Sequence, residues 1–146
     1  MGVSGLWVLE LKSATWTVYL PCEKDGTCPL LEYLLEKAGK QGERTLALLR
    51  EHVPLHGVSR LPSGRSRKLE GCKYPIYEFR WHRKGPDFRV FYLFPKGARK
   101  TILCVSAFDK REKTPKTEIQ QAEDAYVHIA KAISISSLHV IKLESE

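Results

Sequence analysis

No apolar run in the sequence approaches the length that a membrane span requires. A membrane-spanning helix needs about 20 consecutive apolar residues, and polar or charged residues interrupt every apolar stretch of this chain before that length. The first residues also lack the basic and apolar regions of a signal peptide. These absences predict a cytoplasmic protein that does not associate with a membrane.

Cysteines are few, and they do not have the spacing of a metal site. The chain has four of them, Cys22, Cys28, Cys72 and Cys104. Because disulfides are rare in the cytoplasm, we expect reduced thiols, with Cys104 in the core. A Cys22–Cys28 disulfide is the alternative.

The sequence also lacks a convincing histidine site. His52 and His56 are four residues apart, but Pro54 and Gly57 are expected to break the helix that would align them. No glutamate lies between the two histidines, as it does in zinc proteases. The sequence therefore predicts neither a metal ion nor any other cofactor.

Internal repeats and disordered tracts are missing as well. The chain has 146 residues, which is enough to bury a core without disulfides or metals. We therefore predict a single domain over residues 1–146. Within it, residues 1–14 are a candidate N-terminal extension and residues 134–146 form a C-terminal tail.

Positive charge is present in excess and is unevenly placed. The formal net charge is +7, but residues 58–116 carry +11, while residues 1–57 carry −1 and residues 117–146 carry −3. A basic middle between weakly acidic ends indicates a surface that binds a polyanion. The alternative is a solvated basic face that only aids solubility.

Three β-prone runs lie inside this basic region. They cover residues 74–81, 88–94 and 101–108, and turn residues at 84–87 separate the first two. The last run is apolar and β-branched, as expected for a strand covered on both faces. This pattern predicts an antiparallel meander.

Helical patterns flank the meander on both sides. A helix starting at Thr27 or Cys28, with Pro29 in its first turn, precedes a second helix over residues 43–53. Their apolar stripes predict a helical hairpin that covers a sheet. In the first helix the stripe consists of Leu30, Leu31, Leu34, Leu35 and Ala38.

Breaks and ends of the helices are marked by glycine and proline. Gly39 and Gly42 are expected to interrupt the chain between the two helices of the hairpin. Thr114 and Pro115 predict the start of a third helix that runs to about Ile133. Residues 58–71 are polar and are expected to form a loop.

The two ends of the chain leave alternatives open. Residues 5–11 are either a hairpin partner of the β-prone run at 15–20 or an extension. Residues 134–143 either prolong the last helix or add a strand at the sheet edge. The fold class is α+β in every case.

Four segments of the chain carry a family resemblance when they are taken in order. They are Leu69–Gly71, Ile76–Arg80, Phe88–Tyr92 and Phe108–Pro115. This set resembles the RelE/ParE toxin superfamily, and within it the phage-derived, HigB-like branch. The last segment lacks one residue of the family pattern, and the resemblance spans roughly residues 16–130.

The resemblance implies a RelE-like α+β fold, in which a helical hairpin packs on a twisted antiparallel sheet and a C-terminal helix follows. It implies a toxin of a type II toxin–antitoxin module, silenced by a small helix-turn-helix antitoxin. RelE-like members are metal-independent endoribonucleases that cut mRNA on the ribosome. ParE-like members bind gyrase. An mRNA-cleaving toxin is our prediction, and a non-catalytic module, either gyrase-poisoning or an inactive phage remnant, is the alternative.

The resemblance also assigns roles to positions. Arg80 matches a position that is basic in RelE-like nucleases, and Arg89 matches an arginine that contacts phosphate. Lys110 or Arg111 matches the basic pair after the last strand. The tyrosine that some RelE-like toxins use near the C-terminal end has no counterpart here, and neither has the His/Asp set of certain HigB toxins.

RNA cleavage by 2′-oxygen attack needs a base, an acid and a group that stabilises charge on phosphorus. Arg80 and Arg89 suit the last role, because a guanidinium group meets phosphate oxygens in two places and keeps its charge. Crowding by cations lowers the pKa of lysine, and histidine titrates near neutrality. Candidates for base and acid are therefore Lys110 and Lys113, beside Arg111, and His82. Candidate RNA contacts outside this set are Arg65, Arg67, Lys68, Lys73, Arg83 and Lys84.

Each of these residues also has a purely structural interpretation. His82 is then an exposed turn residue, and Glu78 is the partner of a neighbouring arginine. Arg89 is then a strand residue paired with an acid from the helical hairpin. If Arg89 instead contacts phosphate, Arg89→Ala should impair cleavage far more than folding. Aromatic residues expected in the core rather than against RNA bases are Trp81, Tyr92 and Phe94.

Overall fold

The computed structural model describes residues 6–58, 64–81, 88–109 and 116–143. The strands are β1 Leu6–Ser13, β2 Thr17–Pro21, β3 Gly64–Lys68, β4 Tyr77–Trp81, β5 Phe88–Leu93, β6 Thr101–Asp109 and β7 Leu138–Lys142. The helical elements are α1 Pro29–Glu32, η1 Tyr33–Lys37, α2 Gly39–Ala47, η2 Leu48–His52, α3 Val53–His56 and α4 Lys116–Ser134, where η marks a π-helical turn.

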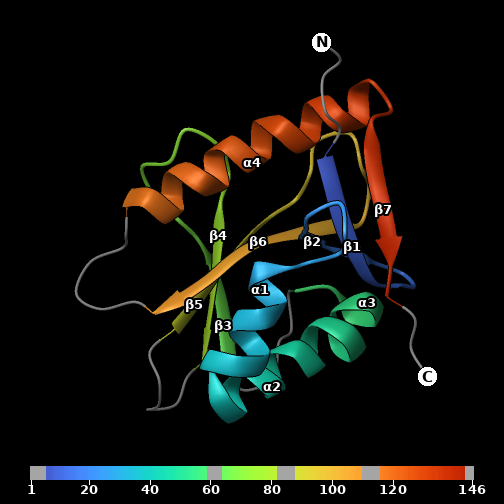
Figure 1. Ribbon diagram of the computed structural model, residues 1–146. Helices are drawn as coiled ribbons and strands as arrows, with labels where there is room; N and C mark the ends of the chain where they lie inside the picture. The colour runs from blue at the N-terminus through green and yellow to red at the C-terminus, as the bar shows by residue number, and fades with distance from the viewer. Residues whose placement is uncertain (1–5, 59–63, 82–87, 110–115, 144–146) are drawn as a thin grey trace.

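The strands form one seven-stranded sheet in the order β3-β4-β5-β6-β2-β1-β7. The helical segment α1–α3 covers one face, and α4 covers the other (Figure 1). This arrangement confirms the predicted α+β fold with a helical hairpin and a C-terminal helix.

The predicted meander is confirmed, because β4, β5 and β6 are antiparallel neighbours. The complete sheet is nevertheless mixed rather than antiparallel throughout. Strand β2 pairs in parallel with β6, and β7 pairs in parallel with β1. Strand β6 pairs with β5 of the meander on one side. On its other side it pairs with β2 of the β1–β2 hairpin, and β2 runs parallel to it.

Both ends of the chain supply strands. Strand β1 pairs with β2 in an antiparallel hairpin, so residues 6–13 are a hairpin partner and not an extension. After α4 the chain turns back and forms β7 at the sheet edge, next to β1. Of the two alternatives for the tail, the edge strand is therefore the one observed.

The helical hairpin begins as predicted, with Cys28 as N-cap and Pro29 in the first turn. Its second arm starts at Gly39, four residues before the predicted start, and continues to His56. Gly39 has a φ of +60° and marks the corner. Gly42 lies inside α2, so the predicted break there is wrong. Leu35 is 53% exposed and does not belong to the core as predicted.

Gly42 is required by packing and not by a turn. A Cβ atom at this position would lie 2.0 Å from the carbonyl oxygen of Leu34 and 2.7 Å from the Cβ of Ala38. Gly42 is itself buried. A residue without a side chain therefore lets the two arms of the hairpin approach each other closely.

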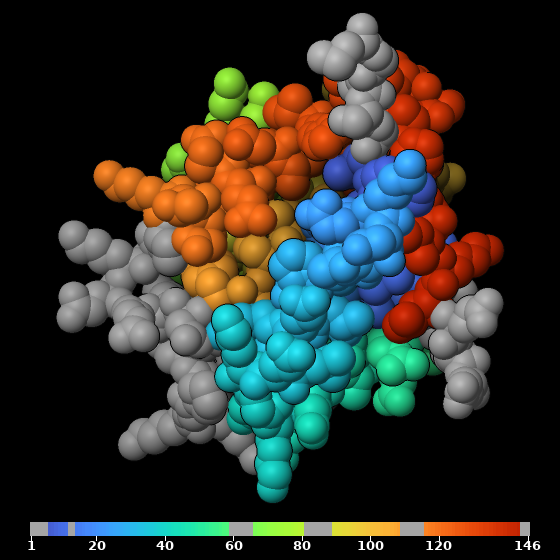
Figure 2. Space-filling view, viewed as in Figure 1, coloured from blue at the N-terminus to red at the C-terminus, as the bar shows by residue number. Residues whose placement is uncertain are grey.

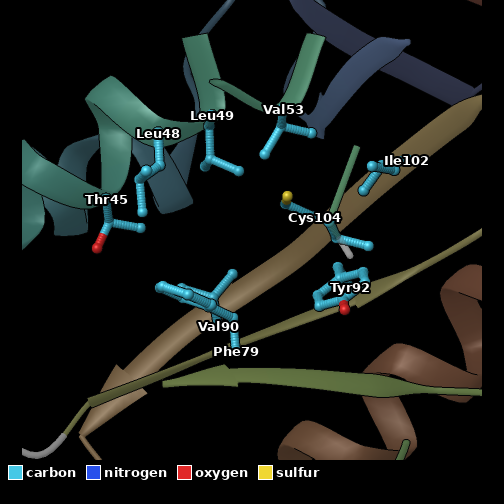
Figure 3. A pocket seen from close by; sticks show the side chains of 10 residues that line it. Thr45, Leu48, Leu49, Val53, Phe79, Val90, Tyr92, Ile102 and Cys104 are labelled. Carbon is cyan, nitrogen blue, oxygen red and sulfur yellow. The ribbon is translucent and has the colours of Figure 1, made fainter. Parts of the chain in front are cut away.

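The core on the hairpin face contains a narrow apolar cavity of about 20 Å³ (Figure 3). Leu48, Leu49 and Val53 point into it from the helices, and Val90 and Cys104 point into it from the sheet. The volume is about that of one water probe, and the lining side chains carry no charge. We regard it as a packing gap and not as a ligand site.

The core on the opposite face lies under α4. Ala122 and Ile129 of the predicted stripe are fully buried against Phe91, Leu103 and Phe108 of the meander. The helical periodicity of α4 is thus confirmed from Lys116 onward. The predicted cap at Thr114 and Pro115 lies outside the described residues.

Strand β3 was missed by the sequence analysis, which predicted a loop over residues 58–71. Its sequence, Gly-Arg-Ser-Arg-Lys, has no apolar alternation. An edge strand needs only one paired neighbour, and basic side chains at an edge discourage unwanted pairing with other chains. Polar composition therefore excludes a central strand but does not exclude an edge strand.

All four cysteines are free thiols, and Cys104 is buried in the core as predicted.

The predicted helix break before His56 is wrong. Pro54 lies in the first turn of α3, where its missing N–H is tolerated, and the His52 and His56 rings are 4.8 Å apart. Across the described ranges, no cluster of three metal-binding side chains occurs. No helix in those ranges is long and apolar enough to cross a membrane.

Candidate functional site

A buried carboxylate in the second strand of the sheet joins two arginines. Glu78 on β4 is 1% exposed. Its Oε2 atom accepts a hydrogen bond of 3.0 Å from Nε of Arg67 on β3. Its Oε1 atom lies 2.7 Å from Nε of Arg89 on β5. We call Arg67, Glu78 and Arg89 the arginine–glutamate bridge.

Strand register explains why these three side chains meet. Arg67 is directly opposite Glu78 in the β3–β4 pair, and Phe91 is directly opposite Glu78 in the β4–β5 pair. Arg89 is two residues from Phe91, so it lies on the same face at the diagonal position. Phe91 packs in the core under α4. The bridge therefore lies on the α4 face of the sheet.

The two arms of the bridge differ in exposure. The Arg67 side chain is 57% exposed, whereas that of Arg89 is 8% exposed. A buried carboxylate is strongly disfavoured unless it is paired, and here two guanidinium groups share a single negative charge.

Arg80 adds a further cation beside the bridge. It follows Glu78 by two residues on β4, so it lies on the same face, and it is half-buried. We call Arg67, Arg80 and Arg89 together the basic end of the sheet. Strand β4 ends there at Trp81, β5 begins there at Phe88, and β6 ends there at Asp109.

Two predicted RNA contacts lie away from this end. Lys68 is exposed and lies opposite Tyr77 in the strand register, so alternation places it on the hairpin face. Lys73 lies near α4. Its backbone N–H donates to Glu123, and its Nζ atom lies 5.6 Å from the centre of the Tyr74 ring.

Several predicted site residues fall outside what the structure describes. Arg65 is described only through its backbone, which is opposite Arg80 in the strand register. The candidates outside the described residues are His82, Arg83, Lys84, Lys110, Arg111 and Lys113. Their proposed roles remain predictions.

The structural interpretation of Glu78 as an arginine partner is confirmed. Arg89 is also paired with an acid, but the acid comes from the neighbouring strand and not from the helical hairpin as expected. Tyr92 is buried and stacks on Tyr77 at 5.5 Å, which confirms that it is a core residue. Phe94 packs at the margin of the same cluster.

The fixed position of Arg67 is the feature that sequence reasoning missed. Placed in a presumed loop, Arg67 was only one basic residue among several. The available signal was the alternation of Arg65, Ser66 and Arg67 after Gly64, which is compatible with a short edge strand. No pattern in the sequence indicated its partner.

A second hollow lies on the surface between α1–η1 and α4, with β6 at its floor (Figure 2). It has a volume of about 430 Å³, and its lining includes Glu32, Glu36 and Glu118 along with Lys37. Acidic side chains therefore predominate here, in contrast to the basic end of the sheet. The two surfaces differ in the ligands that they can attract.

Comparison with protein families gives a match over residues 35–127 to the model described as Phage derived protein Gp49-like (DUF891). These residues make up more than half of the chain, and they include the whole basic end of the sheet. The chain belongs to the Gp49-like family of phage-derived proteins. This family is part of the RelE/ParE superfamily of toxin–antitoxin toxins. No curated protein matches the chain.

Membership in the Gp49-like family confirms the superfamily part of the predicted resemblance. The HigB-like branch is a finer assignment and remains a prediction. The match begins within η1 and ends within α4. The Gp49-like core thus contains the second arm of the helical hairpin and the meander, while α1, the β1–β2 hairpin and β7 lie outside it.

Proposed function

We propose that the protein is the toxin of a toxin–antitoxin module and an endoribonuclease that cleaves mRNA on the ribosome. The observation that carries the proposal is the basic end of the sheet, which gathers Arg67, Arg80 and Arg89 on one face of a Gp49-like domain. RNA phosphates are the ligands that such a cluster of guanidinium groups suits. The proposed site of action is the cytoplasm.

The proposed chemistry combines the basic end of the sheet with residues that are predicted from the sequence. Guanidinium groups at the basic end stabilise negative charge as the 2′ oxygen attacks phosphorus. Base and acid come from the predicted set Lys110, Lys113 and His82, with Arg111 as the cation beside the two lysines. The reaction as proposed uses no metal ion and no cofactor. The proposed partners are mRNA, the ribosome and a cognate helix-turn-helix antitoxin.

Induced expression in a bacterial host without antitoxin tests the proposal. We expect protein synthesis to fall before DNA replication does, and primer extension should reveal new 5′ ends in mRNA. Arg80→Ala should weaken both effects. The matched control is Arg99→Ala, because Arg99 is exposed in the loop between β5 and β6 at the other end of these strands. Arrest of replication with intact mRNA would instead favour a gyrase-poisoning module.

A further inference from the structure

The two arginines of the bridge are not equivalent toward a ligand. More than half of the Arg67 side chain is exposed, whereas 8% of the Arg89 side chain is. A phosphate approaching from solvent therefore reaches the guanidinium group of Arg67 and meets little of that of Arg89. Arg67 is therefore positioned to bind a phosphate, whereas Arg89 is positioned to stabilise the residues around it.

Arg67 is held by one edge of its guanidinium group. Its Nε atom donates to Glu78, so this bond does not use the two terminal nitrogens, and the side chain as a whole is 57% exposed. Those nitrogens can donate paired hydrogen bonds to phosphate oxygens. An arginine that is already fixed loses less rotamer freedom on binding than a mobile one. The bond to Glu78 therefore preorganises Arg67.

Glu78 in turn depends on Arg89. A carboxylate that is 1% exposed needs compensation by a nearby positive charge. Arg67 supplies this only in part, because water screens its exposed side chain. Arg89, buried and 2.7 Å from Oε1, supplies the rest. Arg89 therefore stabilises the charge of Glu78, and Glu78 in turn holds Arg67 in place.

We propose that Arg67 makes the phosphate contact at the basic end of the sheet, and that Glu78, braced by Arg89, is the positioning residue that holds it. This inference rests on the RNA-cleaving function proposed above. It moves the phosphate contact from Arg89, where the family resemblance placed it, to Arg67 on the edge strand. Arg89 acts through Glu78.

Binding to an uncleavable RNA tests the contact. The probe is a pool of single-stranded RNA of mixed sequence with every 2′-hydroxyl methylated, which cannot undergo 2′-oxygen attack. Arg67→Ala should weaken binding by about 10- to 100-fold, the size of one or more lost charge-assisted hydrogen bonds. Arg67→Lys should recover part of the loss, because it restores the charge without the planar fork. The matched control is Arg99→Ala, which removes an exposed arginine in the loop between β5 and β6, away from the basic end of the sheet.

A double-mutant cycle tests the positioning role. Glu78→Gln alone should weaken binding by about tenfold, but it should add no loss in the Arg67→Ala background, where nothing remains to be positioned. It should lower the melting temperature in both backgrounds, because the residue is buried in either case. If Glu78→Gln does not fold, Arg89→Lys replaces it in the same cycle.

The outcomes separate this inference from the proposed function. Strong coupling between Arg67 and Glu78 in RNA affinity supports it. Additive losses overturn it, as does wild-type affinity in Arg67→Ala. Cleavage of mRNA on programmed ribosomes is measured alongside. If the wild-type protein binds the RNA pool but leaves that mRNA intact, the nuclease function fails, while the binding cycle still decides the positioning role. A wild-type protein that does neither overturns both.

Discussion

Two buried titratable side chains make the folded state sensitive to high pH. Burial raises the pKa of Cys104 from 9.0 to about 12 and that of Tyr92 from 10.0 to about 12. Both groups therefore stay protonated in the folded protein at pH values where the unfolded chain loses its protons. Their contribution to stability is complete below about pH 9 and is lost as the pH rises toward 12.

We expect the free energy of unfolding to fall between pH 9 and pH 12, as measured by urea denaturation at a series of pH values. Tyr92→Phe removes one of the two groups, so its stability should fall less steeply above pH 10 than that of the wild type. Equal slopes for the two proteins would show that Tyr92 does not contribute in this way.

At the level of elements, the helical hairpin depends on the absence of one side chain. The Cβ added by Gly42→Ala would overlap the carbonyl oxygen of Leu34, and backbone atoms cannot move aside cheaply. We expect a loss of about 3 kcal/mol or more in the free energy of unfolding. The measurement is urea denaturation at neutral pH.

Gly39→Ala is the matched control for Gly42→Ala. An added Cβ there meets no atom within 4 Å, so the cost comes only from the φ of +60°. That cost is about 1 to 2 kcal/mol for an ordinary residue. A smaller loss for Gly42→Ala than for Gly39→Ala would contradict the packing explanation.

Elements with strong periodicity were predictable from the sequence. The continuous apolar and β-branched run at residues 101–108 identified β6, and the stripe through Ala122 and Ile129 identified α4. Strand β3 was not predictable from a local pattern, because its residues are polar and bury little and its pairing depends on contact with β4. The parallel β2–β6 and β1–β7 pairs depend on tertiary packing that no local pattern encodes.

The candidate site was predictable in its residue types but not in its geometry. Basic residues of the middle region were identified, and Glu78 was expected to pair with an arginine. The exposure of Arg67 and the burial of Arg89 follow from strand order and from the position of α4. These are properties of the assembled sheet. A sequence pattern alone therefore could not distinguish the exposed arginine, Arg67, from the buried one, Arg89.

For the whole molecule, the uneven charge predicts RNA affinity that depends strongly on salt. Each phosphate that is neutralised releases counterions, so the logarithm of the affinity should fall linearly with the logarithm of the salt concentration. Arg65, Arg67 and Lys68 are all candidate RNA contacts from the sequence, and a residue that contacts phosphate contributes to that slope. In the structure, Arg67 lies on the α4 face of the sheet and Lys68 lies on the hairpin face. Arg67→Ala should therefore reduce the slope by about one.

The control for the salt series is Lys68→Ala, which should leave the slope unchanged because Lys68 lies on the hairpin face. Filter binding or fluorescence anisotropy at 50 to 400 mM salt, roughly the range over which screening changes most, provides the measurement. An affinity that does not vary with salt would rule out an electrostatic role for the basic end of the sheet.

The order of strands in the sheet also affects how soon after synthesis the sheet can be completed. Thr17 on β2 pairs with Thr101 on β6, and Leu6 on β1 pairs with Leu138 on β7. Contacts between such distant parts of a chain form slowly, because a long loop must close first. Strand β1 therefore cannot pair with β7 until almost the whole sheet has been synthesised. A newly made chain therefore passes through an interval in which its sheet is incomplete, and during that interval its unpaired strand edges are open to capture by another protein.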